Sequence, residues 1–197
     1  MPVLEASLSP DVRLALAYAP TGVRPIQLAA FALDAKLAGI VGHAREVLLA
    51  QIKLAWWRER LAETPAQRPK GEPLLATLAG WSGPVDPLLA LIDGWEAMLD
   101  PDEPNPQALA DGRAALGQGL AMQAGASQAA AAAAAAMRDW SLVSCGLDGD
   151  LAALSLPRSL RALAVLQGLA RRRGGKRPLL DGPLALAAAM RIGMIGR

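Results

Sequence analysis

The chain has 197 residues, of which 53% are apolar and 19% charged, and its formal net charge is +2. This composition is typical of a folded protein with a substantial core, and it excludes a disordered chain and a globally basic nucleic-acid binder. The single cysteine, Cys145, and the single histidine, His43, exclude an intramolecular disulfide and a metal site built from several such residues.

Prolines and glycines divide the chain into segments of helical length, and strand-favouring residues are scarce, so we predict an all-α fold within one domain, 1–197. The first long helix begins with Pro10 at its first position, after Ser9 as a candidate N-cap, and it ends near Pro20 and Gly22. The other predicted helices, in chain order, cover 25–41, 44–63, 72–80, 84–99, 106–124, the eight alanines of 129–136, 157–173 and 182–195.

Two adjacent tryptophans, Trp56 and Trp57, lie in the predicted helix 44–63. Trp56 continues an apolar stripe with Leu48, Ile52 and Ala55, whereas Trp57 points about 100° away, toward the side of Leu54 and Leu61. The two indoles therefore face different neighbours, and we expect this helix to lie between two packing partners. Packing is favoured over ligand binding for the pair, because large aromatic side chains are more often found in cores.

The segment FALDAKLAGIVGHAREVLLAQIKLAWWRERL (31–61) resembles the N-terminal signature of the squalene/phytoene synthase family, in which an aspartate-bearing helix precedes a helix with Trp-Trp-Arg. PLLALIDGWEAMLD (87–100) is similar to the next segment of that family. LPRSLRALAVLQGLARR and ALAAAMRIGMIGR resemble the C-terminal helices of short alphaproteobacterial members and of the related mitochondrial complex I assembly factor. The resemblance implies an isoprenoid synthase-like helical bundle, shortened relative to the enzymes.

The family's enzymes join two prenyl diphosphates, using Mg²⁺ ions held by two Asp-x-x-x-Asp motifs on facing helices. Aligning Phe31 with the start of the family signature puts the first motif at 38–42, which here reads AGIVG. Ala38 and Gly42 therefore occupy the two positions where the resemblance implies carboxylates. No second motif is found, since Asp139 lacks an acid four residues later. We predict no catalytic residues, no metal site and no cofactor.

Other acids are weaker candidates for chemistry. Asp93, Glu96 and Asp100 share one helix face, and a solvated acidic face is favoured over a cation site. Asp34 lies one helical turn before Ala38 and two residues before Lys36, and we interpret it as a surface residue. Its position on the helix also makes it a candidate for the cavity. The candidates for lining a ligand cavity are Phe31, Asp34, Ala38, Gly42, Trp56 and Trp57.

The segment RRRGGKR (171–177) holds five cations in seven residues. Arginines in a last helical turn interact favourably with the helix dipole, and this explanation needs no ligand. The alternative is an anion site, with phosphate or anionic lipid preferred over nucleic acid because aromatic side chains are not interleaved. The anion-binding candidates are Arg171, Arg172, Arg173, Lys176 and Arg177.

Location is inferred from the N-terminus and the apolar runs. Residues 1–13 carry an acid at position 5 and no continuous apolar stretch, so we expect no signal peptide. No run of ~18 uninterrupted apolar residues occurs, which argues against a spanning helix. With the lone thiol, these features predict a cytoplasmic protein, and contact with the periphery of the inner membrane is left open.

Taken together, the retained packing signature and the missing acids favour a catalytically degenerate member of the family, a pseudoenzyme that binds a partner protein or an apolar, lipid-like ligand. By resemblance, a role in respiratory complex assembly is implied. The alternative is a prenyl-diphosphate transferase of isoprenoid biosynthesis with rearranged Mg²⁺ ligands, which requires at least two carboxylates converging in a deep cavity.

Overall fold

The computed structural model describes residues 2–148, 151–173, 180 and 183–195, and its regular elements in these ranges are all helices. The N-terminal part contains α1 (Pro2–Ala6), α2 (Pro10–Ala17), α3 (Arg24–Gly42), α4 (Val47–Ala62), α5 (Pro73–Leu78) and α6 (Asp86–Glu96). The remainder contains α7 (Pro106–Gln123), a 3₁₀ turn (Ser127–Ala129), α8 (Ala130–Ser144), a second 3₁₀ turn (Arg158–Leu160), α9 (Arg161–Arg173) and α10 (Pro183–Ile195). The predicted helices are all present, and the short α1 was not predicted.

Local chemistry explains where most of these helices begin. Proline occupies one of the first two positions of α2, α3, α5, α6 and α7, where its missing N–H leaves no helical hydrogen bond unmade. Asn105 caps α7 by accepting a 3.0 Å hydrogen bond from the N–H of Ala108. Ser9 has the extended backbone of an N-cap, but its hydroxyl makes no capping bond.

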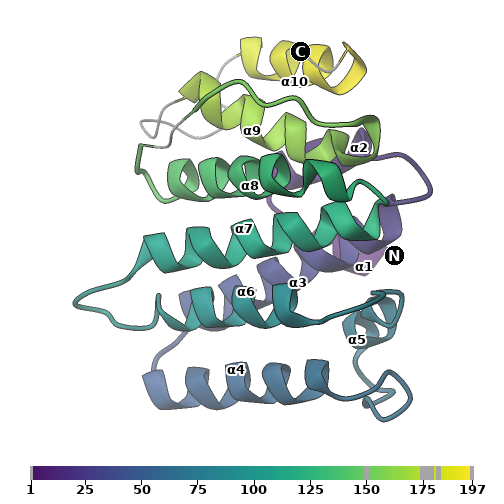
Figure 1. The fold of residues 1–197 in the computed structure, drawn as a ribbon. Helices are drawn as coiled ribbons and strands as arrows, with labels where there is room; N and C mark the ends of the chain where they lie inside the picture. Colours follow the sequence, from purple (N-terminus) through teal and green to yellow (C-terminus); the bar gives the residue numbers. More distant parts are fainter. Residues whose placement is uncertain (1, 149–150, 174–179, 181–182, 196–197) are drawn as a thin grey trace.

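The helices form a stack with a second group behind it (Figure 1). α4, α6, α7, α8, α9 and α10 follow one another across the stack, and α1, α2 and α3 lie behind them. α4 therefore forms one end of the stack and α10 the other. α3 contacts α4, α5, α6 and α7, whereas α2 contacts α9 and α10.

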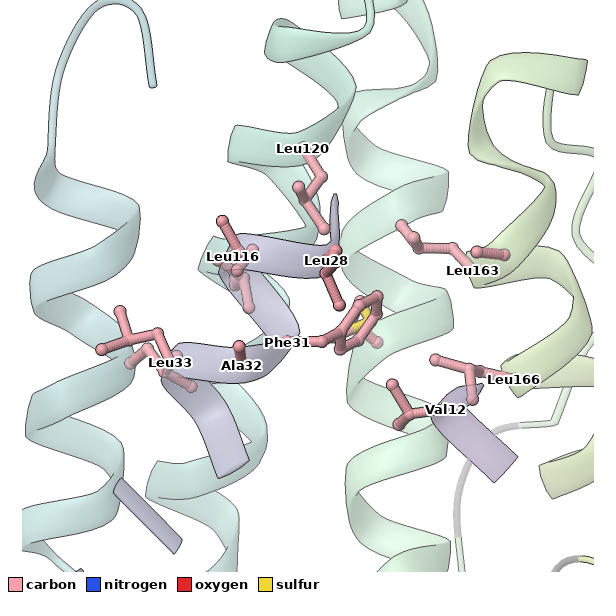
Figure 2. Close-up of a cluster of buried hydrophobic side chains, with 14 of the residues drawn as sticks. Val12, Leu28, Phe31, Ala32, Leu33, Leu116, Leu120, Leu163 and Leu166 are labelled. Atoms are coloured by element: carbon pink, nitrogen blue, oxygen red, sulfur yellow. The ribbon is translucent and has the colours of Figure 1, made fainter. Parts of the chain in front are cut away.

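Phe31 of α3 lies in the apolar interior between these two groups. Figure 2 shows it among side chains from α2, α7 and α9, including Val12, Leu120 and Leu163. The ring of Phe31 meets the Trp140 ring of α8 edge to face, with centroids 6.1 Å apart. α3 thus connects the back group to α4, α6 and α7, and α2 connects it to α9 and α10.

The same helix is relevant to the membrane question. Within the described residues, α3 is the one helix long and apolar enough to cross a bilayer by length and composition. Half of that apolar stretch is buried inside the structure, as in the core helix of a folded domain.

Candidate functional site

A cavity of about 710 Å³ opens between α2, α3, α7 and α8. Its lining combines apolar side chains such as Phe31 and Ala38 with three charged ones, Asp11, Asp34 and Arg113. Asp34 and Ala38 are one helical turn apart on α3, so both are presented toward the same space.

Asp34 and Arg113 form a buried ion pair in this cavity. Arg113 Nη2 lies 2.9 Å from Asp34 Oδ2, and Arg113 Nε lies 3.1 Å from Asp34 Oδ1, which is a two-point contact. Trp95 Nε1 donates a further hydrogen bond of 2.7 Å to Asp34 Oδ1. Asp34 is 5% exposed and Arg113 is 7% exposed. The interpretation of Asp34 as a surface residue is therefore wrong, because its helix face turns toward α7 and the partner lies there.

Two indole rings cover the guanidinium of Arg113. Its central carbon is 4.4 Å from the centroid of Trp140 and 5.1 Å from that of Trp95, both within cation–π range. Arg113 Nη1 also contacts Ser141 Oγ at 3.3 Å. Trp140 Nε1 in turn donates a 2.9 Å hydrogen bond to Asp11 Oδ2. One continuous polar network thus joins side chains of α2, α3, α6, α7 and α8.

Sequence reasoning did not single out Arg113, Trp95, Trp140 or Asp11. One signal was available, because Arg113 is the only cation of α7, PQALADGRAALGQGLAMQ, and is surrounded by small and apolar residues such as Gly112, Ala114 and Leu116. A charge at such a position needs a buried partner.

A second hollow, of about 940 Å³, lies between the C-terminal half of α3 and α4. We call it the α3–α4 groove; its apolar lining includes Ile40, Leu49 and Ile52. Trp56 and Trp57 both line it, with their rings at 90° and centroids 5.2 Å apart. Residues Ser7 and Ala35 line both hollows, so the groove adjoins the cavity.

The two tryptophans differ in burial. Trp57 is 2% exposed and packs in the core, as predicted for its side of the helix, whereas Trp56 is 37% exposed. Leu48 and Ile52, on the stripe of Trp56, are 66% and 56% exposed. α4 contacts both α3 and α6, so the expected two packing partners are present, although Trp56 lines the α3–α4 groove and stays partly exposed.

The sequence profile of squalene/phytoene synthases matches residues 7–111. The chain belongs to the squalene/phytoene synthase family. The matched stretch includes Asp11, Asp34 and Trp95 and ends two residues before Arg113. Comparison with curated proteins and with solved structures gives no match. The predicted membership and the predicted all-α, isoprenoid synthase-like fold are confirmed, and the relationship to the mitochondrial assembly factor stays a prediction.

In squalene/phytoene synthase terms, the first aspartate motif is expected at Ala38 and Gly42. Ala38 lines the cavity. Gly42 is the last residue of α3, is exposed, and lines neither the cavity nor the α3–α4 groove. A Cβ built at Gly42 would have no atom within 4 Å. The cavity candidates thus divide, with Phe31, Asp34 and Ala38 around the cavity and the two tryptophans in the groove.

The acids of this family member do not cluster as metal ligands do in the part of the chain that the structure describes. Among the described residues, no group of three or more His, Cys, Asp or Glu side chains is arranged to hold a metal ion. Asp93 and Glu96 both accept from Arg58 Nη2 of α4, at 2.5 and 2.8 Å, and these bonds raise the pKa of Arg58. Asp100 accepts instead from the backbone N–H groups of its own loop.

The remaining candidates lie near the end of α9. Arg171 is exposed, and its Nε donates a 2.8 Å hydrogen bond to the carbonyl of Leu151. Arg172 is exposed as well. Lys176, Arg177 and the side chain of Arg173 lie outside the described residues. The anion-binding hypothesis for this segment stays a prediction.

Cys145, just beyond α8, is half-buried next to the cavity-lining residues Ser144 and Gly146. Burial raises the pKa of its thiol, and the positive charge of Arg113 opposes this in part. The neutral thiol is therefore favoured at physiological pH, as expected for a packing residue rather than a nucleophile.

Proposed function

We propose that this squalene/phytoene synthase-family protein has lost metal-dependent prenyl transfer and binds an apolar, lipid-like ligand in the cavity between α2, α3, α7 and α8. One observation carries the proposal. Asp34, the acid one helical turn before Ala38 on the cavity wall, has both carboxylate oxygens engaged by Arg113 and Trp95.

The energetics of the ion pair support a non-catalytic cavity. Mg²⁺ binds through carboxylate oxygens and keeps a strict geometry, so Asp34 would have to leave Arg113 in order to hold the ion. Arg113 would then remain buried without its counter-ion, which costs roughly 3–5 kcal/mol. The pair instead neutralises the charge at this part of the wall.

The rest of the lining supports an apolar ligand. Leu8, Val12, Phe31, Ala38 and Val143 provide apolar surface around the ion pair. The volume of about 710 Å³ is within the range of small-molecule sites, roughly 300–1,000 Å³. A mostly apolar wall with a few fixed polar groups is the usual design of such sites.

The family resemblance supports a related form of the proposal, in which the fold binds a partner protein and serves respiratory complex assembly. In this form of the proposal the protein is cytoplasmic, and the cations from Arg171 onward contact the periphery of the inner membrane. This form makes no use of a diphosphate substrate or of Mg²⁺.

A second candidate is a prenyl-diphosphate transferase with rearranged ligands. It is favoured by the presence of two carboxylates, Asp11 and Asp34, in the lining of one cavity. Under this alternative Mg²⁺ is required, and both acids must exchange their indole and guanidinium partners for the ion.

Calorimetric titration with farnesol, an uncharged isoprenoid, tests ligand binding. Ala38→Leu fills part of the cavity and is expected to weaken farnesol binding by about tenfold or more. Gly42→Leu is the matched control, because it makes the same side chain one turn away, outside the cavity, and is expected to leave binding unchanged. Equal effects of the two substitutions, or no farnesol binding, would count against the cavity as the binding site.

Diphosphate release tests the alternative. We expect farnesyl or geranylgeranyl diphosphate incubated with the protein and Mg²⁺ to release no more diphosphate than the protein-free reaction. Release that requires Mg²⁺ and is lost in a folded Asp34→Asn or Asp11→Asn variant would establish the transferase and overturn the non-catalytic proposal.

A further inference from the structure

α4 is apolar on two opposite faces. Ala50, Leu54, Trp57 and Leu61 form the inner face and are buried. Leu48, Leu49, Ile52 and Trp56 form the outer face and are exposed. An apolar face of this size is normally covered, but α4 ends the stack, and Leu49, Ile52 and Trp56 line the open α3–α4 groove without being buried by any described element (Figure 1). The outer face therefore lacks the partner that its composition requires.

The residues of the outer face are spaced symmetrically in sequence about Ile52. Leu48, Ile52 and Trp56 are spaced by four residues and form one ridge along the helix. Arg45 precedes Ile52 by seven residues, and Glu59 follows it by seven. We call the set Arg45, Leu48, Leu49, Ile52, Trp56 and Glu59 the α4 strip.

This arrangement is self-complementary for an antiparallel pair of α4 helices. When two copies meet about Ile52, a residue before Ile52 faces the residue that follows it by the same number of positions in the second copy. Leu48 then faces Trp56 of the second copy, and Arg45 faces Glu59 of the second copy. The two-fold symmetry makes each contact twice, and antiparallel helices also oppose their dipoles favourably.

Both end charges of the α4 strip are available for such a contact. Arg45 is exposed and makes no ion pair with any described residue. The Glu59 side chain is 68% exposed; Arg60 contacts it at 3.2 Å and contacts Glu63 more closely, at 2.9 Å. Arg60 thus keeps a partner if Glu59 turns to a second copy.

The charges also distinguish a second copy from an anionic membrane. The charges near the outer face are of both signs, with Glu46, Glu59 and Glu63 beside Arg45, Lys53 and Arg60. An anionic bilayer would repel the acids and attract the cations, whereas an antiparallel copy places Arg45 against Glu59 and pairs opposite charges.

We propose that the α4 strip is a homodimer interface, in which two copies of this chain pair antiparallel with the two-fold axis at Ile52. Trp56 is the expected anchor, because aromatic residues at the centre of an interface contribute most to binding. The proposal is independent of the ligand of the central cavity.

Sedimentation velocity over a range of protein concentrations gives the first test. The unaltered protein is expected to dimerise, and Leu48→Glu is expected to make it monomeric while its circular dichroism stays helical. Leu186→Glu is the matched control, because it makes the same change at an exposed leucine of α10, at the opposite end of the stack (Figure 1). This control is expected to remain a dimer.

Charge reversal tests the register. Arg45→Glu and Glu59→Arg should each weaken dimerisation roughly tenfold, since each replaces two attractive contacts by repulsive ones. The combined variant should restore the original dissociation constant. In a Cys145→Ser background, Ile52→Cys should form a disulfide-linked dimer, whereas Glu59→Cys, far from the axis, should not.

Several results would overturn the proposal: a monomer at every concentration, a dimer that survives Leu48→Glu, a dimer lost with Leu186→Glu instead, or no rescue by the combined reversal. Retention of a monomeric protein on phosphatidylglycerol vesicles, lost with Leu48→Glu, would assign the strip to a membrane and likewise overturn it.

Discussion

At the scale of single residues, the Asp34–Arg113 pair defines the chemistry of the cavity. Sequence spacing placed Asp34 three residues after buried Phe31 and four before Ala38, but its acidic side chain and the nearby Lys36 suggested a surface position. The partner that makes burial of this acid favourable is 79 residues further along the chain. Burial of a charge depends on such a partner, and the residues next to Asp34 in the sequence do not predict which residue that partner is.

We predict that Arg113→Ala lowers the free energy of unfolding by roughly 3–5 kcal/mol, because it leaves Asp34 buried without its counter-ion. Arg138→Ala, which removes the exposed α8 partner of Asp111 on α7, should cost about 1 kcal/mol or less. Urea denaturation measures both values. Similar losses of unfolding free energy for the two variants would show that the buried pair contributes no more to stability than the exposed pair.

At the scale of elements, α7 and α8 illustrate how small residues set the distance between helices. Propensity alone predicted a helix through the alanine run, and small side chains were expected to let a neighbour approach. In the structure that neighbour is α7: a Cβ added at Gly117 would lie 2.5 Å from the carbonyl oxygen of Ala133 and 2.9 Å from Met137 Cγ. Gly112 approaches the carbonyl of Ala90 on α6 equally closely.

Gly117→Ala is therefore expected to destabilise the protein by about 1–3 kcal/mol, because α7 and α8 must move apart to admit one methyl group. Gly39→Ala is a matched helical control with no atom within 4 Å of the added Cβ, and it should stabilise by about 0.5–1 kcal/mol through helix propensity. Thermal or urea unfolding gives the sign of each change. A stabilising Gly117→Ala would contradict the close approach.

At the scale of the whole molecule, contacts between distant segments connect the two ends of the chain. Asp11 of α2 accepts from Trp140 of α8, 129 residues later, and Gln27 of α3 donates to the carbonyl of Ser159, 132 residues later. The buried apolar cluster extends from Leu8 to Ala189 among the described residues. The part of the chain that matches the family profile, 7–111, thus shares its core with the part that follows it.

We predict a single cooperative unfolding transition for the whole chain, as expected for one domain with a shared core. Helix content by circular dichroism and tryptophan fluorescence should give coincident midpoints in urea. Trp57 in α4 and Trp140 in α8 report from different parts of the stack, so Trp57→Phe and Trp140→Phe variants separate their signals. Two resolved transitions would show that the chain unfolds as separate units.

The sequence by itself determined the longer helices, the all-α fold and the family. Helix starts, alanine propensity and apolar periodicity act over a few residues, so they can be read locally. The tertiary structure decided the rest: which acid Arg113 neutralises, which hollow receives Trp56, and that α4 has one covered and one uncovered face. These properties depend on segments far apart in the chain, because burial and ion pairing are set by what packs against a residue rather than by its neighbours in sequence.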